Sequence, residues 1–319
     1  MKAFVLKKNN IRLEDVSIPE LKPGQVLIKT KAVSLNPVDF KIIKGAFNLP
    51  KPRTIGIDVA GEIVEKASFV TNLKAGDRVC ALVNIFETGS FAEYVAVDSS
   101  AVSLIPNNVS YTDASTIPCA GITAWQAVIQ KINIHPQQKI FISAGGGGVG
   151  GYAIQFAKKK GAYVITSASK DFERISKLGA DEIINYKKQD VLEEVLKRTE
   201  NRGVDFMIDS ISKENIAQHR EMLRFNGMIV GITGLPEKYL YPPFSKAAGM
   251  VEVALVAAYT NGDNSILTEI AAVGSEIAHG IAEGKYETNI GCTIDFKDIP
   301  EGLDKLSGGR ISGKLVAIL

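Results

Sequence analysis

The stretch that decides the fold is Ile140-Phe-Ile-Ser-Ala-Gly-Gly-Gly-Gly-Val-Gly-Gly-Tyr-Ala-Ile-Gln-Phe-Ala-Lys158. A short apolar run enters a cluster of glycines and then a segment of helical periodicity, so the stretch predicts a strand, a tight turn and a helix. A backbone without Cβ atoms comes close to a pyrophosphate, and the first amides of the following helix stabilise its charge. A glycine-rich linker is the alternative, but linkers are not normally flanked by apolar residues at this spacing.

The glycines satisfy the pattern G-x-G-x-x-G in two registers, one starting at Gly145 and one at Gly146. Spacing alone therefore leaves open which amides face the phosphates. We expect the turn as a whole to bind a dinucleotide. The expected binding residues are Ala144, Gly145, Gly146, Gly147, Gly148, Val149 and Gly150.

The two halves of the chain have different patterns. Up to about residue 110 it is rich in strands and turns, and the expected strands are Ala3–Leu6, Gln25–Val33, Val59–Val64, Arg78–Val83 and Phe91–Val97. From about residue 120, strands alternate with helices. The expected strands there are Lys139–Ala144, Ala162–Thr166, Val204–Asp209 and Met228–Thr233, and the expected helices are Gly151–Lys160, Lys170–Leu178, Asp190–Arg198 and Lys213–Phe225.

Such alternation predicts an α/β domain with a doubly wound parallel sheet that binds its ligand at the carboxyl ends of the strands. A long helical pattern follows at Ser265–Glu283, and Thr293–Leu319 returns to short strands and turns. We expect this last segment to rejoin the N-terminal β domain. The expected domains are therefore residues 119–263 for the dinucleotide-binding domain and residues 1–118 with 264–319 for the β domain.

The composition excludes several classes of partner. With 45% hydrophobic and 23% charged residues the chain is an ordinary globular protein, and a net charge of +2 favours neither nucleic acid nor an anionic membrane. Ala3–Leu6 is too short for a signal-peptide core, and the most apolar stretch, Ala247–Tyr259, contains Glu252 and falls short of about 20 residues. We expect a cytoplasmic protein. Three scattered cysteines argue against a disulfide framework: Cys80, Cys119 and Cys292.

Several motifs in one order resemble the medium-chain dehydrogenase/reductase superfamily, specifically its zinc-free quinone oxidoreductase branch. They are Leu35-Asn-Pro-Val-Asp-Phe-Lys41, Gly56-Ile-Asp-Val-Ala-Gly61, Ala75-Gly-Asp-Arg-Val79, Gly89-Ser-Phe-Ala-Glu-Tyr94, Gly121-Ile-Thr-Ala-Trp125, Gly147-Gly-Val-Gly150, Leu178-Gly-Ala-Asp181 and Gly313-Lys314. The resemblance runs almost from end to end. It implies a GroES-like β domain built from both chain ends and a Rossmann domain, with the active site between them.

The resemblance also bears on zinc. Zinc-dependent members have a metal-binding cysteine where Asn36 stands, Gly-His-Glu where Gly56-Ile-Asp58 stands, and a lobe with four cysteines, none of which is present. A catalytic zinc needs about three protein ligands, and the histidines lie outside these motifs: His135, His219 and His279. We expect no metal. Without a Lewis acid the chemistry left is hydride addition to an electron-poor carbon.

The position about 20 residues past the glycines reports on the cofactor, because an acidic residue there binds the ribose 2′-hydroxyl of NAD. Here it reads Ser167-Ala-Ser-Lys170, and hydroxyls with a cation favour the 2′-phosphate of NADPH. Alternatively, Ser169 only caps the next helix, or Asp171 binds the ribose of NADH. Tyr186 matches a family tyrosine near the adenosine phosphate. Alternatively, Tyr186 is only a half-buried tyrosine at a strand end, with no contact to the cofactor.

Other candidate residues come from the resemblance. Asn36 and Thr123 resemble family residues that line the nicotinamide end of the site, although neither is an acid or base at neutral pH. Arg310 resembles a basic residue that lies near the cofactor in the family. Alternatively, Arg310 is a solvated cation on a loop and does not bind the cofactor. We expect Asp39 to anchor its own turn and Asp209 to cap a strand end.

The sequence contains no evident constellation for acid–base or covalent catalysis. Rate acceleration is therefore expected to come from positioning the nicotinamide against an activated acceptor. Three loop phenylalanines of the β domain are candidates for an apolar pocket, although such residues are more often core: Phe40, Phe47 and Phe86.

We therefore expect an NADPH-dependent reductase of quinones or α,β-unsaturated carbonyls whose substrate is a small electrophile. A short-chain dehydrogenase lacks support because no Tyr-x-x-x-Lys pair is visible, and neither it nor a methyltransferase explains the β half. A non-catalytic NADPH-binding sensor or structural protein of the same fold is the other hypothesis. The apolar, strand-like residues Val251–Ala258 predict a homodimer that pairs through this edge.

Overall fold

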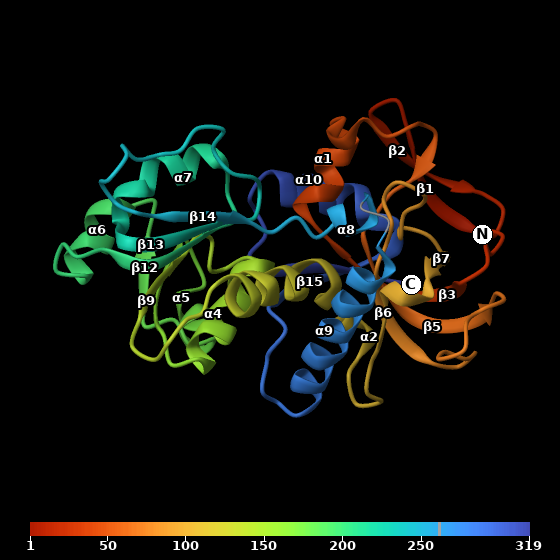
Figure 1. The fold of residues 1–319 in the computed structure, drawn as a ribbon. Helices are drawn as coiled ribbons and strands as arrows, with labels where there is room; N and C mark the ends of the chain where they lie inside the picture. The colour runs from red at the N-terminus through yellow and green to blue at the C-terminus, as the bar shows by residue number, and fades with distance from the viewer. Residues whose placement is uncertain (261–262) are drawn as a thin grey trace. The chain divides into compact units, whose positions relative to one another are not determined.

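The computed structural model describes residues 1–260 and 263–319. The chain forms two compact units: residues 1–122 with 256–319, called the β unit, and residues 123–255, called the α/β unit. Both chain ends belong to the β unit (Figure 1). Residues 261 and 262, which fall inside the expected range 119–263, lie outside the described residues.

The α/β unit is built on a six-stranded sheet in which neighbouring strands are all parallel. Its strands are β9 (Lys139–Ile142), β10 (Tyr163–Ala168), β11 (Glu182–Asn185), β12 (Val204–Asp209), β13 (Leu223–Gly231) and β14 (Gly249–Glu252). The order is β11-β10-β9-β12-β13-β14, so the chain runs outward from β9 in one direction and from β12 in the other. This reversal is the switch point where doubly wound sheets bind ligands, at the carboxyl ends of the strands. The predicted doubly wound sheet is confirmed.

Helices cover both faces of this sheet. Helices α4 (Gly148–Lys159) and α5 (Phe172–Lys177) lie on one face, and α6 (Val191–Arg198) and α7 (Lys213–His219) lie on the other (Figure 1). Because both faces are covered, the strands bury apolar side chains in both directions, which is why they lack polar alternation. The buried core includes Phe141, Ile165, Ile184, Val195, Met207 and Ile229.

Several expected elements of this region were wrong in extent. The strand expected at Met228–Thr233 is β13, which begins at Leu223 and ends at Gly231. Helix α7 ends at His219 instead of Phe225, because the Tyr241 hydroxyl donates to the Arg220 carbonyl at 2.7 Å and Leu223 is already fully buried as the start of β13. The expected strand Val251–Ala258 ends at Glu252. The chain then leaves the sheet, and residues 257–260 form helix α8 (Ala257–Thr260) in the β unit.

The β unit contains a seven-stranded sheet and a three-stranded sheet. The larger sheet consists of β3 (Gln25–Leu35), β5 (Asp58–Lys66), β6 (Arg78–Leu82), β7 (Tyr94–Asp98), β8 (Val102–Leu104), β15 (Ile290–Asp295) and β16 (Lys314–Ile318). Its order is β15-β16-β3-β5-β6-β8, with β7 also paired to β3. The smaller sheet consists of β1 (Lys2–Lys7), β2 (Asn10–Asp15) and β4 (Arg53–Thr54). The C-terminal strands thus join the N-terminal sheet, as predicted.

The β unit also carries helices. They are α1 (Pro37–Ile43), α2 (Tyr111–Ala114), α9 (Asn264–Ala282) and α10 (Ile299–Ser307). Helix α10 replaces the turns expected after residue 293. Its sequence begins Ile299-Pro300, and a proline is compatible with the first turn of a helix, where its missing N–H is not needed. Ile299 and Leu303 are buried and form the inner face of α10.

The segment from Ile117 to Lys131 joins the two units. It consists of two π-helical stretches, Ile117–Gly121 and Gln126–Lys131, on either side of α3 (Ile122–Trp125). Within residues 1–260 and 263–319, no helix has the length and apolar character needed to cross a bilayer.

Candidate functional site

The glycine turn between β9 and α4 has little room for side chains. Ala144 adopts a left-handed conformation with φ 52°, and its carbonyl accepts a hydrogen bond from the Gly147 amide at 2.9 Å. A Cβ atom on Gly150 would lie 2.3 Å from the Ala144 carbonyl oxygen, and one on Gly145 would lie 2.2 Å from Thr166 Oγ1. The tight fold of the turn therefore requires glycine at both positions.

The turn leads directly into the N-terminus of α4, whose N-cap is Gly147. The first amides of a helix have no carbonyl one turn earlier to accept their hydrogen bonds, and they carry the positive end of the helix dipole. No acidic side chain lies in the first turn of α4 to offset this charge. The cradle of residues 144–150 therefore fits the pyrophosphate of a dinucleotide.

Ser167 supports the turn from β10. Its side chain is 4% exposed, its hydroxyl oxygen accepts a 3.4 Å hydrogen bond from the Ala144 amide, and its carbonyl accepts one of 3.0 Å from Gly145. Ser167 therefore fixes the glycine turn to the sheet. The sequence suggested that Ser167 contacts the phosphate, whereas its hydrogen bonds in the structure give it a positioning role.

Ser169 and Tyr186 are brought together by neighbouring parallel strands. In the β10–β11 register Ala168 pairs with Asn185, and the Tyr186 hydroxyl donates to Ser169 Oγ at 3.2 Å. Lys170 follows on the exposed surface. Two hydroxyls and a cation thus gather at the carboxyl end of β10, the place that the sequence predicted for a 2′-phosphate.

The idea that Ser169 caps helix α5 is wrong, because the N-cap residue is Asp171. Asp171 adopts a left-handed conformation with φ 57°, and its carboxylate lies 3.2 Å from Arg174 Nη2. An ion pair with Arg174 already engages the first acidic group that follows β10 in the sequence. This arrangement weakens the alternative in which Asp171 binds a ribose hydroxyl.

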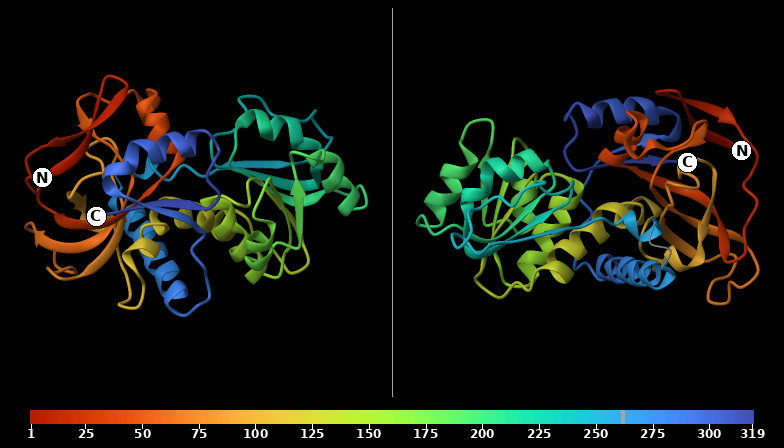
Figure 2. Two further views of the ribbon diagram at one scale, coloured as in Figure 1. Left: turned by 180° about the vertical axis from the view of Figure 1, so that it is seen from behind. Right: turned by 45° about the horizontal axis from the view of Figure 1, so that its top comes forward.

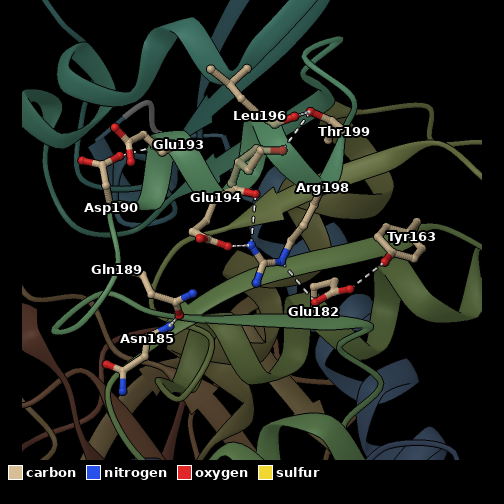
Figure 3. A network of polar contacts seen from close by, with 11 residues as sticks. Tyr163, Glu182, Asn185, Gln189, Asp190, Glu193, Glu194, Leu196, Arg198 and Thr199 are labelled. Atoms are coloured by element: carbon tan, nitrogen blue, oxygen red, sulfur yellow. Dashed lines mark hydrogen bonds and ion pairs between the residues drawn. The ribbon is translucent and has the colours of Figure 1, made fainter.

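A polar network holds β11 and α6 in place (Figure 3). Arg198 Nε donates to Glu182 at 3.1 Å, the Tyr163 hydroxyl donates to the other oxygen of Glu182 at 3.2 Å, and Arg198 Nη1 also binds Glu194. The Asn185 amide donates to Gln189 Oε1 at 3.1 Å. These contacts fix the end of the strand that presents Tyr186.

A buried polar cluster lies at the start of α1 in the β unit. The Asn36 side chain, 3% exposed, donates through Nδ2 to Asp58 Oδ2 at 2.8 Å and to the Ser34 carbonyl at 3.2 Å. Its Oδ1 accepts from Lys314 Nζ at 2.5 Å. Both donors of the Asn36 carboxamide are therefore used inside the β unit.

Two buried carboxyl groups belong to this cluster. Asp58 accepts hydrogen bonds from Ser34 Oγ at 2.5 Å and from the Cys119 amide at 2.8 Å; burial raises its pKa, and Lys314 opposes the rise. Burial raises the pKa of Asp39 to about 8. Asp39 accepts from the Asn36 amide at 2.7 Å, so the expectation that it anchors its own turn is confirmed.

The other predicted residues belong to other elements of the chain. Thr123 is 5% exposed on α3 and belongs to the α/β unit, whereas Asn36 belongs to the β unit. Arg310 is exposed on the loop between α10 and β16. Lys314 is the residue whose role sequence reasoning missed. A lysine next to the apolar run Leu315-Val-Ala-Ile318 was the available signal, because a lysine is rarely buried unless it is paired.

Two further expectations can be assessed. Asp209 caps the end of β12, since its Oδ1 accepts from the Ile211 and Ser212 amides at 2.9 and 3.1 Å.

Phe47 and Phe86 are not core residues. They are 49% and 37% exposed, and their rings meet edge to face at 6.3 Å.

The donor set at the position of a catalytic metal does not fit zinc. Asn36, Ile57 and Asp58 occupy the motif positions, and the Lys314 ammonium binds the Asn36 carboxamide oxygen there. Across residues 1–260 and 263–319, no group of three or more His, Cys, Asp or Glu side chains is arranged to hold a metal ion.

Two protein-family models match the chain. Residues 22–107 match the alcohol dehydrogenase GroES-like domain, and residues 148–272 match the zinc-binding dehydrogenase domain. A GroES-like β domain with a Rossmann-type domain defines the class of protein as a dehydrogenase-type oxidoreductase.

Known proteins refine this class. A chloroplastic quinone oxidoreductase of Triphysaria versicolor is 32% identical over 95% of this chain and 92% of its own length. The 2-methylene-furan-3-one reductase of Solanum lycopersicum is 36% identical over 70% of this chain and 59% of its own. The quinone oxidoreductase structure from Coxiella burnetii superposes with a TM-score of 0.85 at 28% identity, covering 100% of this chain and 99% of that one. The chain belongs to the quinone oxidoreductase branch of the medium-chain dehydrogenase/reductase superfamily.

Proposed function

We propose that the protein is an NADPH-dependent reductase that transfers hydride to quinones or α,β-unsaturated carbonyls without zinc. The observation that supports NADPH is the end of β10, where Ser169, Tyr186 and Lys170 lie. The next acidic residue in the sequence, Asp171, is paired with Arg174. A phosphate accepts hydrogen bonds from hydroxyls and ammonium groups, whereas a carboxylate would repel it.

Each part of the chain has a role in this proposal. Residues 144–150 hold the pyrophosphate on the amides of α4, and Ser167 keeps the turn in place. Asn36, Thr123 and Arg310 are proposed to orient the nicotinamide end and the phosphates. When bound, NADPH supplies the hydride. The protein contributes position and a water-poor surrounding, since neither Asn36 nor Thr123 exchanges protons at neutral pH.

The acceptor class follows from the zinc-free donor set. Simple ketones and aldehydes need a Lewis acid or a proton donor to polarise the carbonyl. Quinones and conjugated enones are electrophilic without one. Two relatives, a quinone oxidoreductase and a furanone reductase, carry names that point to the same acceptor classes.

Consumption of NADPH across a panel of quinones, cyclic and acyclic enones and simple aldehydes tests the proposal. We expect turnover with the first three, little with aldehydes, and a preference over NADH. Tight NADPH binding without turnover on any acceptor would instead support a non-catalytic sensor or structural role. The cytoplasmic location stays a prediction, which fractionation of the source cells tests.

A further inference from the structure

We propose that Lys314 is a positioning residue that fixes the orientation of the Asn36 carboxamide, an inference that rests on the proposed function of Asn36. Lys314 is the first residue of β16 and is 4% exposed. The antiparallel register of β16 with β3 pairs Leu315 with Leu35, which brings Lys314 to the start of α1. Its ammonium lies 2.5 Å from Asn36 Oδ1, 3.5 Å from the Leu35 carbonyl and 3.6 Å from Asp58 Oδ2.

The surroundings of the Asn36 carboxamide permit one orientation. A carboxamide has one end that accepts and one end that donates. Here the accepting oxygen faces the ammonium of Lys314, and the donating nitrogen faces the carboxylate of Asp58. A flip would place N–H donors against the ammonium and the oxygen against the carboxylate. Both contacts would be repulsive, so Lys314 and Asp58 together define which atom of Asn36 faces which way.

The ammonium also balances a buried charge. Asp58 is fully buried, and among its described contacts Lys314 is the cation, the others being Ser34, Asn36 and the Cys119 amide. Loss of one partner from a buried pair leaves the other uncompensated. A Lys314 variant therefore has two separable effects: loss of charge, which lowers stability, and loss of the donor to Asn36, which lowers turnover.

Two neutral variants separate these effects. Lys314→Gln keeps an N–H donor on a side chain that is one bond shorter, whereas Lys314→Met keeps neither charge nor donor. We expect both to lower the thermal midpoint alike, and Lys314→Met to lower kcat by about tenfold or more while Lys314→Gln retains most of it. KM for NADPH should change little in either. Equal kcat values for the two folded variants would overturn the proposal.

Lys66→Met is the matched control, because Lys66 also lies in the β unit and donates to a backbone carbonyl, that of Val70, at 3.0 Å. It should leave kcat unchanged. If Lys314→Met does not fold, a cycle of Lys314→Ala with Asn36→Ala gives the answer, because alanine also removes the donor to Asn36. Lys314→Ala should have no further effect on kcat once Asn36 is removed, and additive losses would contradict the proposal.

The cycle also distinguishes this inference from the proposed function. If the unmodified protein reduces no acceptor, the proposed function fails. The same cycle read in thermal midpoints still tests whether Lys314 and Asn36 are coupled. If the losses in thermal midpoint of the two single variants simply add in the double variant, Lys314 and Asn36 do not interact.

Discussion

The Asp39 carboxyl group accepts a hydrogen bond from the Asn36 amide at 2.7 Å with one oxygen, while its other oxygen is buried and has no hydrogen-bond partner among the described residues. A buried carboxylate with an unsatisfied oxygen is unfavourable, and a proton relieves it. This explains why burial raises the pKa of Asp39 to about 8, despite the opposing hydrogen bond from Asn36.

The raised pKa of Asp39 predicts a pH dependence of stability. The folded protein keeps the proton up to about pH 8, whereas the unfolded chain releases it near 3.8, so this group favours folding at low pH and its contribution is lost as pH rises between these values. The slope is at most about 1.4 kcal/mol per pH unit. The variant Asp39→Asn should remove this contribution to the pH dependence of stability, because an amide does not titrate.

Urea unfolding of the two proteins from pH 5 to 9 checks this prediction. The stability of Asp39→Asn relative to the unmodified protein should increase up to about pH 8. Asp15→Asn, which changes an exposed carboxylate paired with Lys2, serves as control. Parallel profiles for Asp39→Asn and the unmodified protein would show that Asp39 is ionised throughout.

Gly150→Ala should disrupt the dinucleotide cradle. Its Cβ would lie 2.3 Å from the Ala144 carbonyl oxygen, and backbone cannot move away as a flexible side chain can. We expect NADPH binding, measured by fluorescence titration, to weaken more than tenfold, at an overpacking cost of about 1–3 kcal/mol. Gly147→Ala is the milder comparison, since its Cβ would lie 3.2 Å from the same oxygen. A similar small loss for both would mean that the turn relaxes easily.

Lys170→Ala should weaken NADPH more than NADH, because only NADPH has the 2′-phosphate. A charge-assisted hydrogen bond is worth roughly 1.5–3 kcal/mol, or about 10- to 150-fold in Kd. Lys177→Ala, which removes a lysine of α5 paired with Glu173, should leave both affinities unchanged. Equal losses for the two cofactors in Lys170→Ala would make Lys170 a general surface cation.

Activity should not depend on a metal ion. The reason is chemical: an amide, an isoleucine and a carboxylate paired with Lys314 stand at the metal-ligand motif. Dialysis against a chelator should leave turnover intact. Loss of turnover that zinc specifically restores would reject the zinc-free mechanism.

A homodimer is predicted to form through the edge of the six-stranded sheet. Strand β14 occupies this edge and pairs only with β13 among the described strands, which leaves its other side for a second copy. Sedimentation of the unmodified protein at micromolar concentration should show a dimer. A fully active monomer would rule this assembly out.

Sequence reasoning worked best where the signal is local. Val204–Asp209 has the predicted bounds because an apolar run ends at a cap, Asp209, and the glycine turn at residues 144–150 is recognisable from composition alone. Helix α10, which begins Ile299-Pro300, was not predicted from the sequence. Context decides whether a proline breaks a helix or begins one.

The polar cluster could not be predicted for a different reason. Lys314 and Asn36 are 278 residues apart in the sequence, and no local pattern links them. The sequence likewise gives no sign that the donors of Asn36 are already engaged or that Phe47 and Phe86 are exposed. Such facts depend on strand register, which tertiary packing determines.

The position of β16 between β15 and β3 has a consequence for folding during synthesis. The α/β unit consists of contiguous residues, 123–255, and can fold as soon as it has left the ribosome. The β unit cannot, because β3 pairs with β16, which is made only after the whole α/β unit. Until β16 is made, residues 32–35 of β3 lack their partner strand on one side, and a nascent chain with an open β edge is a substrate for chaperones and prone to aggregation.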